Sequence, residues 1–270
     1  MTNSDIMRHR LRNQLLGGSS HTSAATVVQW MGCVQADDYA AAKRSISARL
    51  LAPRYNDTDR LVNEGQLRRS FLLKPLPALV TAADNVRIQP FTLSGVQQAG
   101  RRLHRMLGID AALLRQSRRQ LETALRDGQQ LTRTQLTPLL GLSPQDLRMP
   151  FLLMDAELEG VICNGPLAGK TFTYQLQSHW PMNYDAALAL WLLTDRYFRS
   201  RGPARLHDFV AWSGLSVPQG KKGIAMARLA YQVVDGEAYW YAADMEVTAP
   251  VIRSMKELPK DGEFRITYDG

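Results

Sequence analysis

The sequence has few cysteines and no clustered metal-binding residues. Its two cysteines, Cys33 and Cys163, stand far apart and outside any C-x-x-C motif, which excludes a disulfide framework and argues against a cysteine-bound zinc site. The five histidines are scattered, with no H-E-x-x-H motif and no pair four residues apart. We therefore expect no bound metal and no cofactor.

Long hydrophobic runs are also absent. The longest run, AALALWLL at 186–193, is far shorter than the ~20 residues that a transmembrane helix needs. The N-terminal segment MTNSDIMRHR is polar and lacks the apolar stretch of a signal peptide. We therefore expect a cytoplasmic protein without a membrane partner.

Positive charge is concentrated in one half of the chain. Lys and Arg number 33 against 25 Asp and Glu, and residues 1–130 carry a net +9 while 131–270 carry a net −1. Hydrophobic residues make up 45% of the 270 residues, which is enough for two domains or three small ones with packed cores. A basic half on a folded chain indicates an anionic partner, most readily nucleic acid.

A repeat organises the second half of the chain. LTRTQLTPLLGLSPQD begins at Leu131 and ARLHDFVAWSGLSVPQG begins at Ala204. Each copy predicts a short helix, a glycine turn and a second helix, capped by Ser143 in the first copy and by Ser216 in the second. Each is followed by two β-rich segments, the first pair around an Asn-Gly-Pro turn and the second around Asp-Gly. Helix, turn, helix and hairpin together predict a winged helix.

The first ninety residues fit a third, diverged copy of this pattern. They predict helices at 23–31 and 39–50, a short helix in DTDRLVNEG, and a β-leaning LRRSFLL that ends at a proline break. The predicted fold class is mainly α with small β-hairpin wings (α+β), built as tandem winged-helix repeats. We expect one unit at 1–90, an Arg-rich helical segment with a winged helix at 91–178, a third winged helix at 179–245, and the start of an incomplete or reduced C-terminal region at 246–270.

Two motifs suggest chemistry but are better explained without it. GPLAGKT resembles a phosphate-binding loop, but it has three residues between its glycines instead of four, and a β-like segment follows it. In MDAELEG, Asp155 and Glu159 share one helix face, as residues four apart do. We interpret these carboxylates, with Glu157, as part of a solvated surface.

Clusters of basic residues are the candidates for contact with DNA phosphates. Several recur at near-helical spacing and so form basic stripes. If six of these charges touch phosphate, the logarithm of the affinity should fall with the logarithm of the salt concentration at a slope of about −5. The predicted DNA-binding residues are Arg68, Arg69, Lys74, Arg101, Arg102, Arg105, Arg115, Arg118, Arg119, Lys221 and Lys222.

Gln35 and Asp37 are the candidate catalytic pair. They stand between a helix that ends near Gly32 and another that begins near Tyr39, so an extended segment is expected there. On extended backbone, residues two apart project to the same side. The alternative is that Asp37 or Asp38 only caps the following helix.

The segment around this pair resembles a known family. VVQWMGCVQADDYAAAKRSISARL at 27–50 is similar to the AlkZ/YcaQ-like family of winged-helix DNA glycosylases, whose members carry a Gln-x-Gln or Gln-x-Asp signature at this place. The resemblance continues through LRRSFLLKP, LTRTQL, LLMDAELEGVICNGPLAGKTFTY and RYFRSRGPARLHDFVAWSGLSV, and it spans about residues 8–245. Many relatives carry Arg, Trp and His where this chain has Lys74, Pro77 and Ala78.

The resemblance implies tandem winged helices that bind double-stranded DNA, and hydrolysis of the N-glycosidic bond of alkylated purines, with crosslinks unhooked by some members. Gln35 and Asp37 take the place of the family's signature pair. A purine alkylated at N7 is already a cationic leaving group, so a carboxylate that stabilises the sugar cation and an amide that orients water suffice without a cofactor. The alternative function is a non-catalytic winged-helix DNA-binding protein, such as a transcriptional regulator, and a protein-interaction module is more distant.

Overall fold

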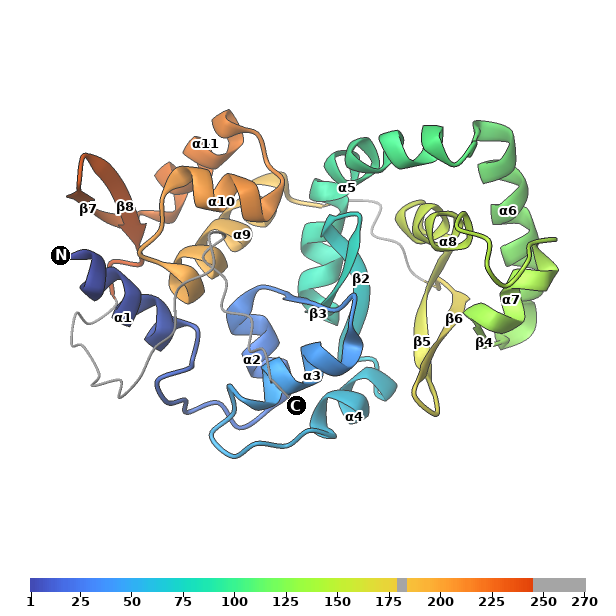
Figure 1. Ribbon diagram of the computed structural model, residues 1–270, viewed down its shortest axis with the longest axis horizontal. Coiled ribbons are helices and arrows are strands. Elements are labelled where there is room, and N and C mark those ends of the chain that lie inside the picture. Colours follow the sequence, from blue (N-terminus) through green and yellow to red (C-terminus); the bar gives the residue numbers. More distant parts are fainter. Residues whose placement is uncertain (179–183, 245–270) are drawn as a thin grey trace. The chain divides into compact units, whose positions relative to one another are not determined.

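The computed structural model describes residues 1–178 and 184–244. The chain divides into two compact units, the first formed by Met1–Thr58 with Asp185–Gly270 and the second by Asp59–Tyr184. Figure 1 labels most of the helices and strands of both units. No helix within the described ranges is both long enough and apolar enough to cross a membrane.

The first unit is built mainly from helices at both ends of the chain. Its N-terminal part contains α1 (Asn3–Asn13), α2 (Ala24–Met31), β1 (Val34–Gln35) and α3 (Tyr39–Ser47), and α4 (Asp57–Asn63) begins at its edge. Its C-terminal part contains α9 (Ala186–Arg201), α10 (Leu206–Ser213), α11 (Val217–Ala227), β7 (Ala230–Val234) and β8 (Glu237–Tyr241).

The second unit alternates hairpins and helices. In chain order it contains β2 (Leu67–Lys74), β3 (Leu76–Thr81), α5 (Ala82–Met106), α6 (Ala111–Ala124), the short 3₁₀ helix η1 (Arg126–Gly128), β4 (Leu131–Thr132), α7 (Arg133–Leu139), α8 (Met149–Leu158), β5 (Ile162–Ala168) and β6 (Thr171–Leu176). The predicted Arg-rich helical segment is thus confirmed as α5 and α6.

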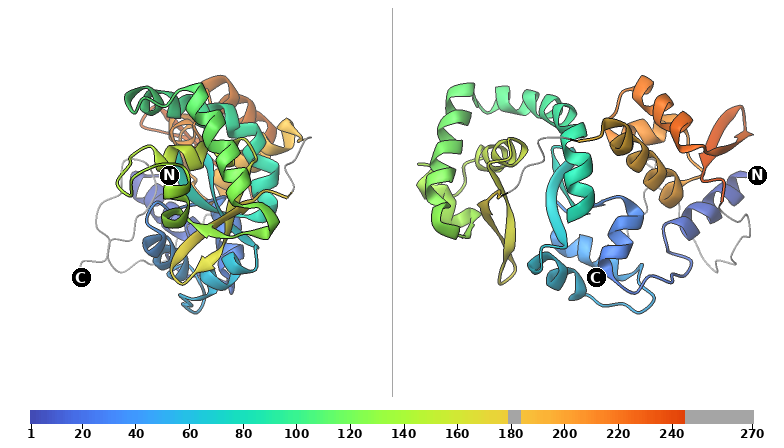
Figure 2. Two further views of the ribbon diagram at one scale, coloured as in Figure 1. Left: turned by 90° about the vertical axis from the view of Figure 1, so that its right-hand side faces the viewer. Right: turned by 180° about the vertical axis from the view of Figure 1, so that it is seen from behind.

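The predicted winged helix of the second unit is present. α6, α7 and α8 are followed by the antiparallel hairpin β5–β6, and β4 pairs with β6 through Leu131 opposite Tyr174, so the sheet order is β4-β6-β5. Figure 2 shows this hairpin from two further directions. The core of this winged helix contains a fully buried leucine from each of its three helices, Leu121 of α6, Leu136 of α7 and Leu152 of α8. These leucines fix the packing of the helices.

The third winged helix repeats this topology in the first unit. α9, α10 and α11 are followed by the hairpin β7–β8, whose turn is Asp235-Gly236, both at positive φ. Ala204 pairs with Trp240 of β8 through two backbone hydrogen bonds, so it stands beside the second strand of the wing, as β4 does in the other copy. The tandem winged-helix fold is therefore confirmed for both copies of the sequence repeat.

After α1, the elements up to residue 81 follow the same order along the chain: the helix α2, the short strand β1, the helices α3 and α4, and the hairpin β2–β3. Ser23 caps α2 through a bond from the Ala25 amide, as predicted. Gly65 follows α4 at a φ of +71°, where glycine avoids the steric cost of a side chain.

Three local predictions are wrong. Ser143 does not cap the second helix of its repeat, because α8 begins only at Met149. The Asn-Gly-Pro sequence is not a turn but lies within β5 at an irregularity in the β5–β6 pairing, and the chain reverses after Ala168. The KPLPALV segment is not a break, since Lys74 pairs with Leu76 and β3 continues through Pro77.

The predicted four-part division at 1–90, 91–178, 179–245 and 246–270 stays a prediction. Its last part, 246–270, lies outside the described residues.

Candidate functional site

The Gln35–Asp37 segment is a short extended connection between two helices. α2 ends at Gly32, whose φ of +76° turns the chain away from the helix axis. Val34 and Gln35 form β1, and Ala36 is fully buried while Gln35 is half-buried and Asp37 is exposed. This alternation is that of extended backbone, on which Gln35 and Asp37 face away from the core side that Ala36 occupies.

The two adjacent aspartates of this segment have different environments. Asp38 is the N-cap of α3, and its side chain accepts a hydrogen bond of 3.0 Å from the Ala41 amide. Among the residues that the structure describes, no group forms a hydrogen bond or an ion pair with the Asp37 carboxylate. Because Asp38 satisfies the helix end, Asp37 is left as an exposed carboxylate one residue earlier.

Exposed arginines of α5 and α6 give the second unit a cationic surface. Arg101, Arg102 and Arg105 are exposed on α5, and Arg115 and Arg119 are exposed on α6. Exposed guanidinium groups on helices are suited to phosphate contact without base recognition.

Arg118 differs from these arginines because acidic groups engage it. Its guanidinium lies 2.9 Å from a Glu159 carboxylate oxygen and 3.5 Å from Asp155. Burial raises the pKa of Asp155 to about 6, an effect that Arg118 opposes and Glu159 reinforces. Asp155 and Glu159 therefore lie on the face of α8 that Arg118 of α6 contacts. The interpretation of Asp155 as a solvated carboxylate is wrong.

Glu157 is the other carboxylate that the sequence analysis assigned to the surface, and the structure buries it. Only 4% of it is exposed, and its carboxylate accepts hydrogen bonds from the Phe71 amide at 3.3 Å and the Asn164 side chain at 3.2 Å. Burial raises the pKa of Glu157 to about 7, although hydrogen bonds from Ser70 and Phe71 and the charges of Arg69 and Arg68 oppose this. The sequence signal was the nearly continuous apolar run MPFLLM before it, which is typical of a buried helix.

Arg68 and Arg69 lie on β2 next to the second wing. They line a hollow of about 170 Å³ together with Asn164 and Gln175. Arg69 lies over the Phe172 ring at 5.2 Å, and Arg68 donates to the Gln177 side chain at 3.4 Å. Both are half-buried, so they present less surface to a partner than the arginines of α5.

The remaining predicted cations lie at exposed positions. Lys74 is exposed at the tip of the β2–β3 hairpin, and Lys221 and Lys222 are exposed on α11. By contrast, Pro77 and Ala78 are buried in β3.

Comparison with known proteins decides the family. Residues 28–258 match the model of the DNA glycosylase AlkZ-like family, which is most of the chain. The chain belongs to the AlkZ-like family of DNA glycosylases. Members of such a family are hydrolases of DNA repair, so DNA is the partner and a DNA glycosylase the activity.

A solved structure supports the fold of this AlkZ-like protein. It is similar to Streptomyces sahachiroi DNA glycosylase AlkZ with a TM-score of 0.72 and 20% sequence identity, over 90% of this chain and 70% of that chain. No match is found among curated proteins.

The AlkZ-like chain has no group of three or more His, Cys, Asp or Glu residues within its described ranges that is arranged to hold a metal ion. The predicted roles of Gln35, Asp37 and the basic residues stay predictions.

Proposed function

We propose that this AlkZ-like protein hydrolyses the N-glycosidic bond of alkylated purines, crosslinked purines among them, in double-stranded DNA. Asp37 and Gln35 are the proposed catalytic residues. The observation that carries this proposal is that Asp37 remains exposed and without a partner among the described residues, while Asp38 caps α3. DNA is the proposed partner in the cytoplasm, at the nucleoid.

The chemistry matches the two side chains. Alkylation at N7 makes the purine a cationic leaving group, so departure of the base needs no strong general acid. The electron deficiency that develops on the sugar is stabilised by a nearby carboxylate, and Asp37 supplies this charge. The same carboxylate accepts a proton from the attacking water as a weak base, and the Gln35 amide orients that water.

Exposed cations would hold the DNA. The arginines of α5, Arg115 and Arg119 of α6, and Lys221 and Lys222 of α11 supply charges that contact phosphates independently of sequence. We propose duplex DNA because a duplex carries about twice the phosphate charge per unit length of one strand, so exposed cations bind it more strongly.

The experiment is release of N7-methylguanine from an oligonucleotide, detected by alkaline cleavage at the abasic product. We expect release from the duplex to exceed release from the single strand, and an N7-crosslinked duplex to be unhooked. Binding of the methylated duplex without any abasic product would contradict the proposal and favour a non-catalytic DNA-binding protein.

The regulator alternative has one observation against it. A helix that reads bases needs exposed side chains, but Leu152, Leu153 and Met154 of α8 are all buried. That alternative places recognition helices around 144–154 and around 217–230. The burial in the middle of α8 counts against the first position, whereas the second lies on α11, where Lys221 and Lys222 are exposed.

A further inference from the structure

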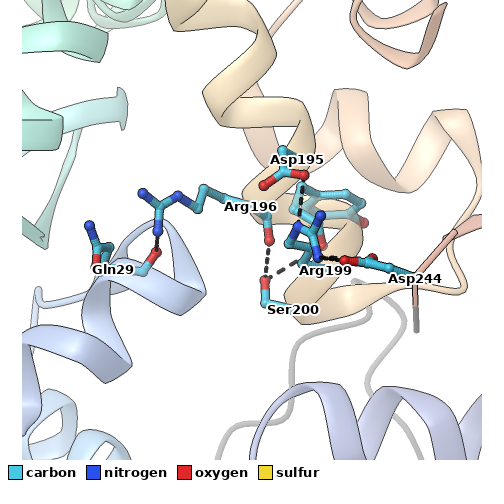
Figure 3. Close-up of polar contacts among 7 residues, drawn as sticks. Gln29, Asp195, Arg196, Arg199, Ser200 and Asp244 are labelled. Carbon is cyan, nitrogen blue, oxygen red and sulfur yellow. Dashed lines mark hydrogen bonds and ion pairs between the residues drawn. The ribbon is translucent and has the colours of Figure 1, made fainter. Parts of the chain in front are cut away.

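Two arginines of α9 hold the chain just before Gln35. The Arg196 guanidinium donates to the Gln29 carbonyl at 2.6 Å, as Figure 3 shows. About one and a half turns further along α9, one terminal nitrogen of Arg201 donates to the Met31 carbonyl at 2.7 Å. The other terminal nitrogen donates to the Cys33 carbonyl at 3.5 Å. These carbonyls belong to the last turn of α2 and to the residue before β1, where a helix end leaves acceptors without intrahelical partners.

Arg201 is itself held firmly. It is 1% exposed, and its guanidinium lies 4.7 Å from the centre of the Trp212 ring and 5.9 Å from that of Tyr197. Its terminal nitrogen also donates to Ser200 at 2.8 Å. A planar guanidinium whose face is covered by rings directs its donors along fixed lines, which a flexible ammonium group does not do.

The backbone at Gly32 comes close to α9. A Cβ added to Gly32 would lie 3.2 Å from the Arg196 Cβ and 3.5 Å from the Trp212 ring. The turn therefore has little room to shift along α9, and the two arginine contacts fix its carbonyl orientation. The segment is also fixed on its other side, because Asp38 caps α3.

We propose that Arg201 is a positioning residue for the catalytic segment, which it orients by holding the carbonyls of Met31 and Cys33. This inference rests on the proposed function, because it assigns Arg201 a role in orienting Gln35 and Asp37. The Cys33 carbonyl is two residues before Gln35, so loss of the guanidinium fork lets β1 rotate and moves the amide and the carboxylate together. A misplacement of about 1 Å costs a rate factor of up to about 100.

The test compares Arg201→Lys and Arg201→Met with wild type under single-turnover conditions on the N7-methylguanine duplex. We expect each variant to lower the rate of base release by roughly 10- to 100-fold while the Kd for the DNA changes less than about twofold. Lysine should not rescue the rate, because a single ammonium point charge does not reproduce the fork. Arg196→Lys should have a smaller effect, since its bond lies further from Gln35.

Arg199→Lys is the matched control on the same helix. Arg199 pairs with Asp195 at 2.8 Å and with Asp244 at 2.8 Å, and both contacts are visible in Figure 3. It donates to neither Met31 nor Cys33, so the rate of base release should not change. A rate equal to wild type in Arg201→Lys would overturn the positioning role, as would an equal loss in Arg199→Lys.

Amide hydrogen exchange separates this inference from the proposed function. We expect the amides of residues 33–37 to exchange faster in both Arg201 variants and those of α10 and α11 to exchange as in wild type. A cooperative thermal unfolding transition should show that each variant is folded. Unchanged exchange at 33–37 overturns the inference whatever the activity. If the wild-type protein releases no base but the Arg201 variants still exchange faster at 33–37, the proposed function is contradicted and the anchoring of the segment by Arg201 is supported. If Arg201→Met does not fold, Arg201→Lys alone decides.

Discussion

Arg118 and Glu159 form an ion pair in which an arginine nitrogen lies 2.9 Å from a carboxylate oxygen. The pair joins α6 to α8, and Gln97 of α5 donates to the same glutamate at 2.9 Å. An arginine that belongs to a basic stripe in the sequence is thus used to hold two helices together. Its neighbours Arg115 and Arg119 are exposed on the same helix.

This difference predicts distinct effects on DNA affinity. Arg101→Ala, Arg102→Ala and Arg105→Ala combined should make the salt slope of the DNA affinity less steep by about 2 to 3, because each lost phosphate contact removes about 0.9. Arg118→Ala should leave the slope unchanged and lower the free energy of unfolding by up to about 1 kcal/mol, since the pair is partly exposed. Fluorescence anisotropy across a salt series measures the first effect and urea denaturation the second. An equal change of slope in both variants would contradict this division of roles.

The buried Glu157 predicts a dependence of stability on pH. Burial raises its pKa to about 7 from an ordinary value near 4.5. Between these values the folded protein holds a proton that the unfolded chain releases, so the free energy of unfolding falls as pH rises from about 4.5 to 7 and is flat above that. The total contribution is at most about 3 kcal/mol.

Glu157→Gln tests this dependence. The substitution keeps one acceptor oxygen for the Phe71 amide and removes the ionisation, so the fall in stability between pH 5 and 7 should become shallower. Urea denaturation at pH 5, 6, 7 and 8 provides the measurement, with Glu64→Gln at an exposed position as control. A variant that keeps the full wild-type slope would show that another group carries the titration.

Lys221 and Lys222 predict sequence-independent contact by α11. Both are exposed on this helix, and lysines bind phosphate as point charges rather than reading bases. The double substitution Lys221→Ala with Lys222→Ala should weaken binding to unrelated duplexes by a similar factor. Weakened binding to one duplex alone would instead indicate that α11 reads bases.

The sequence predicts much of this fold for identifiable reasons. The Asp235-Gly236 turn, the Gly214 helix end and the Ser216 cap are local signals, each determined by residues next to one another, and all three appear in the structure. The start of α8 could not be predicted in this way. Ser143 is a good cap locally, but packing of Met149 and Leu152 into the core of the second winged helix decides where the helix begins.

The candidate site was predicted only in part. The sequence placed Gln35 and Asp37 on an extended segment but left open which aspartate caps α3, because either position permits a cap. The roles of Arg118, Glu157 and Arg201 depend on partners far along the chain, such as the Met31 carbonyl 170 residues from Arg201. Composition and spacing do not encode such long-range contacts.

The most direct test of the central claim compares two neighbouring substitutions, Asp37→Asn and Asp38→Asn. We measure single-turnover release of N7-methylguanine from duplex DNA by both variants and by wild type. The account predicts a loss of at least about 100-fold for Asp37→Asn, within the range for a lost electrostatic contact in a transition state. Asp38→Asn, which keeps a good N-cap residue, should remain close to wild type. Release by Asp37→Asn at the wild-type rate would contradict the assignment of Asp37 as the catalytic carboxylate.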